Sequence, residues 1–516
     1  MILPRFILLL FVLFGLVSCS QKGNEKDVLP NIVILYADDM GYGDLGCQNK
    51  DSKIPTPNLD QLAAEGMRFT DAHSSSGICT PSRYALLTGR YHWRKFHGIV
   101  QAFGPSVFDQ NRLTMGKMLQ EKGYQTACIG KWHLGWNWDT IRNPGSEPMV
   151  MEINGRKRDV FQPDDFNWSL TIPGGPVDQG FDYYFGDDVI NFPPYTWIEN
   201  DRIVDPPTEL YTLGREDTPE GSWECRPGPT VEGWDYYQVL PTLTKKAIEY
   251  IKSRKSDPDP FFLYMAFPSP HAPIIPNDEF RGKSEAGAYG DFVYQTDWCI
   301  GEILSAISDN GLGENTLVVF TSDNGPENYA YPRVRNHDHY SMGDLRGVKR
   351  DVWEGGHRVP FILRWPGTVK GGGINGTTIS QVDLMATFAD IIGYELLDAD
   401  AEDSYSLLPL ADSSFEGSYG REVTVQNTRQ GIYAVRKGDW LLIDHKTGNM
   451  NRLVPAYFDS IRGYEAHDFP GELYNLKTDL SQQINLYTEF PEVVMELKGA
   501  LKATQGIEQI EKALDQ

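Results

Sequence analysis

Cysteine, histidine and positive charge are scarce in this chain of 516 residues. It has six cysteines and ten histidines, and its 71 acidic residues against 47 lysines and arginines give a formal net charge of −24. An acidic chain has no general attraction for nucleic acid, because binding to a phosphate backbone requires a surplus of cations. A polyanionic substrate would also have to be recognised by a local cluster of cations, since the protein's overall field repels it.

The cysteines lack the spacing of a zinc or dithiol motif. They stand at positions 19, 47, 79, 128, 225 and 299, so no Cys-x-x-Cys pair is present. This excludes a zinc knuckle or a redox pair of that type. Cys19 and Cys79 have other expected roles, given below. Whether Cys47, Cys128, Cys225 and Cys299 are paired or buried is left open.

Long hydrophobic runs are absent after the first twenty residues. Arg5 precedes an apolar run from Phe6 to Val17, which is too short to span a bilayer comfortably and predicts an export signal. Residues 16–19, Leu-Val-Ser-Cys, resemble the bacterial lipoprotein box. We therefore expect cleavage of residues 1–18, a lipid on Cys19 as the only membrane contact, and a periplasmic or outer-membrane location. The alternative is an ordinary signal peptide with an incidental cysteine.

Apolar runs of strand length recur, and four of them end in polar residues. Residues 31–37, 124–130, 260–267 and 316–322 lead into Asp38 and Asp39, Lys131 and His133, His271, and Asp323 and Asn324, respectively. Helical patterns alternate with these runs at 57–66, 112–122, 239–254 and 286–308. The alternation predicts an α/β fold with a large, mainly parallel sheet flanked by helices. In such sheets the functional crevice lies at the carboxyl ends of the strands.

Two of these strand ends carry only oxygen ligands. Asp38, Asp39 and Asp323 are carboxylates and Asn324 is an amide, a set that suits a hard divalent cation and disfavours zinc. Calcium fits best and magnesium second. Asp38 and Asp39 alone would equally fit a turn or a helix cap.

Residues 77–91, GICTPSRYALLTGRY, predict a short helix with a thiol at its start. Thr80 fits the N-cap, Pro81 the first turn and Gly89 the C-terminal stop, which places Cys79 at the helix N-terminus, where backbone N–H groups favour anions. Five cations follow in loops expected nearby: Arg83, Lys131, His133, His271 and Lys349. A bound cation, a nucleophile and a ring of cations predict a site for a sulfuryl or phosphoryl group.

Two other classes of thiol enzyme fit less well. A phosphatase of the Cys-x5-Arg type would need arginine at position 85, where the chain has Ala85. A cysteine protease would have no use for an oxygen-rich metal cluster.

The chain resembles the type I sulfatases, the arylsulfatase-like branch of the alkaline phosphatase superfamily. Residues 79–83, Cys-Thr-Pro-Ser-Arg, match the family's C-x-P-S-R, and Thr88-Gly89-Arg90 match the second half of the signature. Further blocks resemble the family in order: YADDMGYGDLG, GKWHLG, SPHAPI, SDNGPE, LRGVKRDVWEGGHRVP and ELYNLKTDLSQQINL. The resemblance covers nearly the whole chain after the export signal.

The resemblance implies that a maturating enzyme oxidises Cys79 to Cα-formylglycine, whose hydrate is the nucleophile. It assigns one calcium ion to Asp38, Asp39, Asp323 and Asn324, with the modified Cys79 also contacting the metal. Arg83 would hold the hydrate, and His133 would be the base that allows sulfate to leave. Lys131, Lys349 and His271 would bind the substrate, with Lys131 and Lys349 on the sulfate oxygens and His271 as the acid that protonates the departing oxygen.

A smaller second domain is expected after the catalytic one. We place an exposed linker at 19–30, the catalytic domain at 31–414 and an α+β subdomain at 415–516. Residues 431–445 predict a hairpin with Lys437-Gly438 at the turn, and residues 491–504 predict a closing amphipathic helix. Family members have such a small antiparallel sheet packed on the large one.

The substrate is the least determined feature. The long stretch after His133 is rich in aromatic residues that offer faces for sugar rings, including Trp136, Trp138, Trp168, Tyr195 and Trp197. With the export signal, this favours a sulfated carbohydrate, either a glycosaminoglycan or a mucin glycan, with galactose or N-acetylgalactosamine sulfate first. The alternatives are a phosphoester or phosphonate hydrolase of the same superfamily and an inactive glycan-binding lipoprotein.

Overall fold

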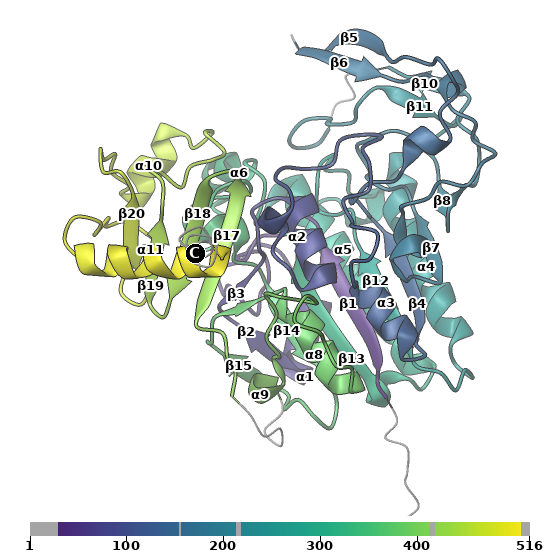
Figure 1. Ribbon diagram of the computed structural model, residues 1–516. Helices are drawn as coiled ribbons and strands as arrows, with labels where there is room; N and C mark the ends of the chain where they lie inside the picture. The colour runs from purple at the N-terminus through teal and green to yellow at the C-terminus, as the bar shows by residue number, and fades with distance from the viewer. Residues whose placement is uncertain (1–28, 154–155, 213–217, 412–417, 507–516) are drawn as a thin grey trace, which may run out of the picture.

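The computed structural model describes residues 29–153, 156–212, 218–411 and 418–506 (Figure 1). The expected signal peptide, Cys19, the linker up to residue 28 and the expected domain boundary at 414/415 lie outside these residues. No helix in the described ranges is long and apolar enough to cross a membrane.

A ten-stranded mixed sheet forms the centre of the molecule. Its order is β15 (Gly373–Asn375), β2 (Met67–Phe69), β14 (Phe361–Arg364), β13 (Thr316–Ser322), β1 (Asn31–Ala37), β12 (Phe261–Ala266), β4 (Gln125–Gly130), β7 (Tyr183–Gly186), β8 (Ile198–Glu199) and β9 (Arg202–Ile203). The central strands β13, β1, β12, β4 and β7 are parallel, whereas β14 runs antiparallel to β13. The four predicted strands are thus adjacent, and their carboxyl ends share one edge.

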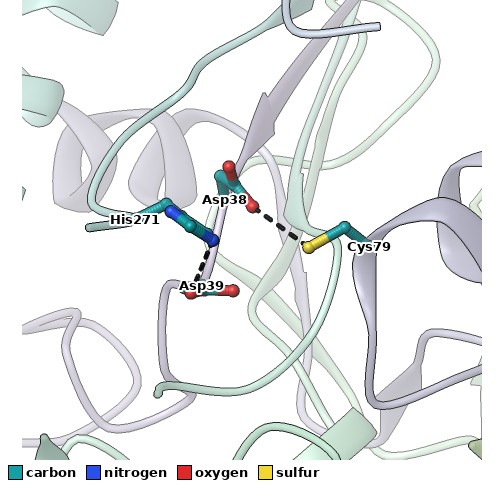
Figure 2. Close-up of side chains that lie close together, drawn as sticks. All are labelled: Asp38, Asp39, Cys79 and His271. Carbon is teal, nitrogen blue, oxygen red and sulfur yellow. Dashed lines mark hydrogen bonds and ion pairs between the residues drawn. The ribbon is translucent and has the colours of Figure 1, made fainter. Parts of the chain in front are cut away.

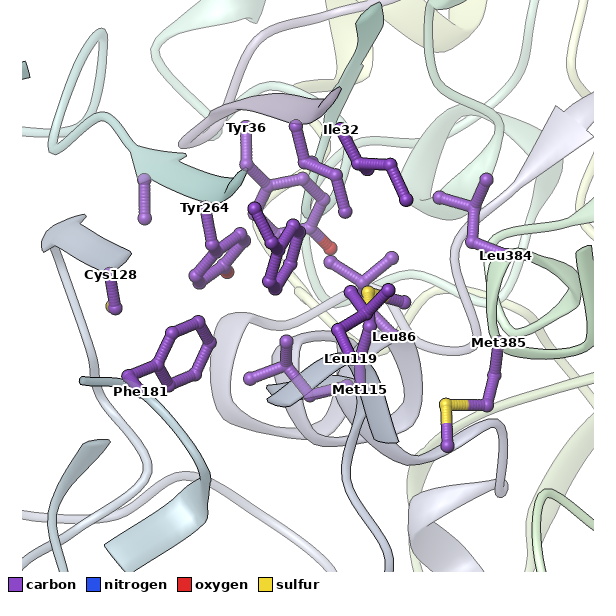
Figure 3. Packing of buried hydrophobic residues seen from close by; sticks show 14 of the residues in the cluster. Ile32, Tyr36, Leu86, Met115, Leu119, Cys128, Phe181, Tyr264, Leu384 and Met385 are labelled. Carbon is purple, nitrogen blue, oxygen red and sulfur yellow. The ribbon is translucent and has the colours of Figure 1, made fainter. Parts of the chain in front are cut away.

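Helices cover both faces of this sheet, and every residue of β1 is therefore buried. Successive side chains of β1 point to opposite faces of the sheet. Ile32 and Tyr36 pack on one face with residues of α2 (Cys79–Thr88), α3 (Met115–Glu121) and α8 (Asp383–Ile392), as Figure 3 shows. Val33 and Leu35 pack on the other with α1 (Pro57–Glu65), α4 (Val239–Ser253) and α5 (Gly287–Asp309). The predicted α/β fold is confirmed. The helix expected at 112–122 begins later, because the Thr114 hydroxyl caps it by accepting from the Lys117 N–H at 3.2 Å.

The C-terminal part is a second, smaller layer beside the central sheet (Figure 1). Its antiparallel strands are β17 (Val423–Arg429), β18 (Ile432–Lys437), β19 (Trp440–Ile443) and β20 (Glu472–Asn475), and α11 (Pro491–Gln505) packs on them. The predicted hairpin and closing helix are both present. The predicted turn is displaced by one residue: Lys437 pairs with Trp440, so Gly438 and Asp439 form the turn, and Gly438 has a φ of 58°.

The segment between β4 and α4 consists mainly of loops and short strands: β5 (Met149–Ile153), β6 (Arg156–Val160), β10 (Glu209–Tyr211) and β11 (Gly228–Thr230). Its aromatic residues do not serve the role expected of them. Trp136, Trp138, Trp168 and Tyr195 are at most 9% exposed, and Trp197 stacks on Phe185. The faces of the four buried residues pack within the protein, so these four are not available to sugar rings.

The remaining elements of the described chain are short. They are β3 (Ala72–His73), which pairs with β16 (Ile379–Ser380), and the helices α6 (Ala330–His337), α7 (Glu354–His357), α9 (Leu408–Ala411) and α10 (Ala456–Arg462).

Candidate active site

Side chains from three separate segments meet at the carboxyl edge of the sheet. Asp38 and Asp39 follow β1, His271 follows β12, and Cys79 begins α2 (Figure 2). One donor atom from each of these four buried residues lies within 4.8 Å of the others, and the Cys79 Sγ is 3.7 Å from Asp38 Oδ1. The parallel sheet thus brings together the acidic strand end, the thiol and the histidine that the sequence places far apart.

The thiol of Cys79 is buried and held in its protonated form. Burial raises the pKa of Cys79 to about 12, against the opposing effect of Lys131 and Lys349. A thiolate is the nucleophilic form of cysteine, so an unmodified Cys79 is a poor nucleophile near neutral pH. This agrees with a precursor role for the cysteine better than with thiolate catalysis.

The start of α2 is built differently from the prediction. The N-cap is Ile78, with extended backbone and no side-chain cap, so the prediction of Thr80 as N-cap is wrong. The Thr80 hydroxyl instead donates to the His133 carbonyl at 2.8 Å and accepts from the Val100 N–H at 3.1 Å. It therefore fastens the helix start to two neighbouring loops. Gly89 is confirmed as the C-terminal stop, with a φ of 62°.

Arg83 lies one helical turn after Cys79 and is fully buried. Its Nε and Nη2 donate to Asp323 Oδ2 at 3.1 and 2.8 Å, and its Nη1 donates to the Lys131 carbonyl at 3.3 Å. Burial alone would lower the pKa of Arg83, but Asp323 and other anionic neighbours raise it above its usual value. Arg83 is therefore a permanent cation that ties α2 to the end of β13.

Two buried lysines each face one carboxylate of the Asp38-Asp39 pair. Lys131 Nζ lies 2.5 Å from Asp38 Oδ2, and Lys349 Nζ lies 2.7 Å from Asp39 Oδ1. Burial by itself would raise the pKa of Asp38, because it favours the neutral carboxyl group. The nearby Lys131, His271 and Arg83 outweigh this effect and lower the pKa of Asp38 to about 2. The aspartate is therefore ionised throughout the neutral range.

The oxygen atoms at this edge fit a hard metal ion. Asn324 uses its Nδ2 to donate to Asp39 Oδ1 at 2.7 Å and to the Gly325 carbonyl, while its Oδ1 is buried without a hydrogen-bond partner among the described residues. Such an orphaned oxygen beside the carboxyl group of Asp39 is a ready ligand for calcium or magnesium. Asp323 is more fully engaged, since Oδ1 accepts from the Asp39 N–H at 3.1 Å and Oδ2 from Arg83.

The two histidines present different ring nitrogens. His271 Nδ1 lies 2.6 Å from the Ala272 carbonyl and so carries the proton donated there, while Nε2 lies 3.7 Å from Asp39 Oδ2. His133 donates Nε2–H to the Val100 carbonyl at 3.1 Å and keeps a buried Nδ1 without a partner in the described structure. Burial, with Lys131 and Arg83, lowers the pKa of His133. A neutral ring with a free Nδ1 lone pair suits a base.

The structure adds residues that the sequence reasoning missed. Arg350 Nη1 lies 2.6 and 2.7 Å from the two oxygens of Glu327, whose Oε2 is 3.9 Å from Lys349 Nζ. Asn451, from the C-terminal part, donates to the Lys349 carbonyl at 2.9 Å. Glu327 and Arg350 stand within the SDNGPE and LRGVKR blocks and so had a sequence signal. Asn451 had none, because its contact exists only once the two parts of the chain pack together.

Comparisons with known proteins agree with this geometry. The Sulfatase family model matches residues 30–394. The N-acetylgalactosamine-6-O-sulfatase of Bacteroides thetaiotaomicron is 32% identical, with 95% of this chain and 96% of the relative covered. Human arylsulfatase A is also 32% identical, with 92% and 87% covered. A solved structure from work on the metabolism of multiple glycosaminoglycans by B. thetaiotaomicron has a TM-score of 0.75 at 32% identity, covering 93% of this chain and 99% of that one.

The family model covers the large sheet, whereas the B. thetaiotaomicron relative and the solved structure extend into the small C-terminal sheet, and together they bear out the resemblance drawn from the motifs around Cys79. The fold is that of the alkaline phosphatase-like superfamily. The chain belongs to the sulfatase family, and its reaction is the hydrolysis of sulfate esters.

Proposed function

We propose that this protein removes the 6-O-sulfate from N-acetylgalactosamine units of a glycosaminoglycan, using a formylglycine made from Cys79. The observation that carries the proposal is the position of Cys79: a buried, protonated thiol at the start of α2, 3.7 Å from an ionised carboxylate. Support for the sugar comes from the 32% identity over 95% of the chain to the N-acetylgalactosamine-6-O-sulfatase of B. thetaiotaomicron.

The formylglycine, as its hydrate, supplies the oxygen nucleophile for this reaction. Arg83 holds residue 79 in register with the sheet through its bonds to Asp323. Lys131 and Lys349 are buried ammonium groups on opposite members of the Asp38-Asp39 pair, and we assign them to the oxygens of the bound sulfate. They place two positive charges next to residue 79 although the chain as a whole is acidic, and each is paired with an aspartate that we also assign to the metal.

The two histidines take the proton-transfer roles. His133 has a free Nδ1 in a neutral ring, so we assign it to removal of the proton that allows sulfate to leave residue 79. His271 has Nδ1–H fixed by the Ala272 carbonyl and Nε2 turned toward the site, so we assign its imidazolium form, with the second proton on Nε2, to protonation of the departing sugar oxygen. Neither role requires a side chain to move from its observed hydrogen bond.

We assign a single calcium ion to Asp38, Asp39, Asp323 and Asn324, with residue 79 as a further ligand. When bound, the cation supplies positive charge beside the nucleophilic oxygen and the sulfate. The orphaned Asn324 Oδ1 is the observation in its favour. Oxygen-only protein ligands favour calcium over zinc, with magnesium second.

Export and maturation are proposed on the sequence alone. We propose that the chain is exported as a bacterial lipoprotein, cut before Cys19 and anchored by a lipid there, in the periplasm or at the outer membrane. A formylglycine-generating enzyme of the same host is the partner that modifies Cys79.

The proposal is tested with protein purified from a host that has the maturation enzyme. Desulfation is measured for N-acetylgalactosamine 6-sulfate, its 4-sulfate isomer and galactose 6-sulfate, with nitrophenyl sulfate and nitrophenyl phosphate in parallel. We expect preference for the 6-sulfated sugars and for sulfate over phosphate. Faster turnover of nitrophenyl phosphate than of nitrophenyl sulfate would favour the phosphoester alternative. Binding of the sugars without turnover of any substrate would favour the inactive glycan-binding alternative.

A further inference from the structure

A cavity of about 490 Å³ lies in the segment between β4 and α4, outside the residues assigned to catalysis. Its lining includes three arginines, one each from the loop after Trp138, from β6 and from the loop that leads into β11: Arg142, Arg158 and Arg226. Figure 1 shows the β5–β6 hairpin and the β10–β11 pair at the same end of the molecule. Three cations from separate segments therefore share one cavity.

Two of these arginines lack the anionic partner that buried cations normally have. Arg142 lies 3.3 Å from Asp139, but Arg158 and Arg226 form no ion pair within the described ranges of the chain. Glu147 and Asp159 also line the cavity without pairing to either. Burial and the charge of Arg158 together lower the pKa of Arg226 to about 10, against the opposing effect of Tyr195 and Glu224. Two like charges that form no close ion pair in one cavity cost free energy, which a bound anion would reduce.

Contacts of Arg226 link the cavity to the active site. The Arg226 guanidinium lies 3.6 Å from the centre of the Phe192 ring, and that ring lies 5.4 Å from the ring of His133. Arg226 Nη1 also donates to Gln101 Oε1 at 2.8 Å, and the residue before Gln101 is Val100, whose carbonyl binds His133. Arg226 is therefore connected to the proposed base, His133, through two short paths.

We propose that this cavity binds a second anionic group of the same saccharide chain, a carboxylate or a sulfate on the sugar next to the one being desulfated. Guanidinium groups match both anions, since each presents two oxygens to the parallel N–H groups of an arginine. The inference rests on the proposed function, because it needs a polyanionic saccharide as substrate. It gives an acidic enzyme a local means of holding an acidic polymer.

The test compares substrates that differ only in the second charge. The first is a disaccharide of hexuronate and N-acetylgalactosamine 6-sulfate. The second is its methyl ester, in which the carboxylate is neutral and the 6-sulfate is kept. The third carries a sulfate in place of the carboxylate. For Arg158→Gln we expect KM for the carboxylate or the sulfate disaccharide to rise about tenfold more than KM for the ester, because a charge-assisted contact is lost. Whichever charged disaccharide is affected identifies the anion.

Lys157→Gln is the matched control, since it removes the same charge from the same strand. Lys157 is exposed, is not part of the cavity lining, and its side chain leaves β6 on the opposite face from Arg158. We expect it to match the parent on all three substrates. Arg226→Gln should repeat the effect of Arg158→Gln, with an added fall in kcat because its guanidinium stacks on Phe192.

Equal KM changes for charged and neutral disaccharides, or none for Arg158→Gln, would overturn the cavity assignment and leave the proposed function standing. A parent enzyme that hydrolyses nitrophenyl sulfate but neither cleaves nor is inhibited by any of these saccharides would overturn both. The two failures are thus told apart by the parent enzyme alone.

Discussion

Arg83 and Asp323 join the start of α2 to the end of β13 through two hydrogen bonds on one carboxylate oxygen. The Arg83 Nε and Nη2 atoms lie 3.1 and 2.8 Å from Asp323 Oδ2, and both side chains are fully buried. The two residues are 240 positions apart in the chain. Since Arg83 follows Cys79 by one helical turn, this contact sets where residue 79 stands relative to the acidic strand end.

Removal of this pair should destabilise the fold as well as the site. In Arg83→Met the Asp323 carboxylate loses its guanidinium, so we expect the free energy of unfolding to fall by about 3–5 kcal/mol. Denaturant unfolding of the purified protein measures it. The double variant Arg83→Met/Asp323→Asn should recover part of the loss, because no uncompensated charge remains. A double variant no more stable than the single one would show that lost packing, not the charge, is responsible.

Cys79→Ala should abolish sulfate ester hydrolysis and leave the fold intact, because it removes the precursor of the nucleophile and only a small buried volume. Turnover of nitrophenyl sulfate and the thermal unfolding midpoint are the two measurements. Cys299→Ala is the control, since it removes another buried thiol from α5. Mass spectrometry of the peptide containing residue 79 should show the aldehyde or its hydrate. Fully active protein with only the thiol would contradict the assignment.

Metal removal should inactivate the enzyme reversibly. We expect a chelator to abolish turnover, calcium to restore it, and zinc to fail, because the proposed ligands are hard oxygens. Asn324→Ala removes the orphaned Oδ1 and should weaken calcium binding by about tenfold or more, comparable with the loss of one ligand contact. Calcium content after dialysis, measured by elemental analysis, checks this without reference to activity. Unchanged calcium retention would exclude Asn324 as a ligand.

His271→Ala should slow the release of poor leaving groups more than good ones. A sugar hydroxyl needs a proton as it departs, whereas nitrophenolate does not, so we expect a loss of about 100-fold or more in kcat for the sugar sulfate and a smaller one for nitrophenyl sulfate. Steady-state kinetics on both substrates gives the ratio. Equal losses on the two would indicate that His271 binds the sulfate or the metal instead of acting as the acid.

His92 should make the fold sensitive to acid. It is fully buried, its Nε2 lies 3.2 Å from Asn427 Oδ1 in β17, and burial lowers its pKa to about 3. The pKa of this histidine is about 6.5 in the unfolded chain and about 3 in the folded one. As the pH falls from about 6.5 toward 3, the unfolded chain takes up a proton that the folded chain does not, so the free energy of unfolding falls.

In His92→Gln this contribution disappears while the amide can still donate to Asn427. We expect the slope of the unfolding free energy against pH, measured from pH 6 to pH 4, to be smaller than in the parent by up to about 1.4 kcal/mol per pH unit. Parallel pH curves for parent and variant would contradict the prediction.

The strands and the catalytic loops are the part that local sequence predicts well. Continuous β-branched runs such as residues 31–37 can only be buried strands, and parallel strands bring their carboxyl ends to one edge. That reasoning predicts that Asp38, Asp39 and His271 lie close together, and the structure confirms it. The resemblance of the motif around Cys79 to the type I sulfatases then implied the reaction, since the residues by themselves fit a sulfuryl or a phosphoryl group.

Hydrogen bonds between distant segments depended on the tertiary structure. The sequence predicts that the Thr80 hydroxyl caps its own helix, but it bonds to the loops of Val100 and His133, which only the packing brings near it. Neither the support of Lys349 by Asn451 nor the approach of Arg158 to Arg226 has a signature in local sequence. Hydrophobic periodicity specifies which face of an element is buried. Which polar groups then meet depends on how the completed layers pack against one another.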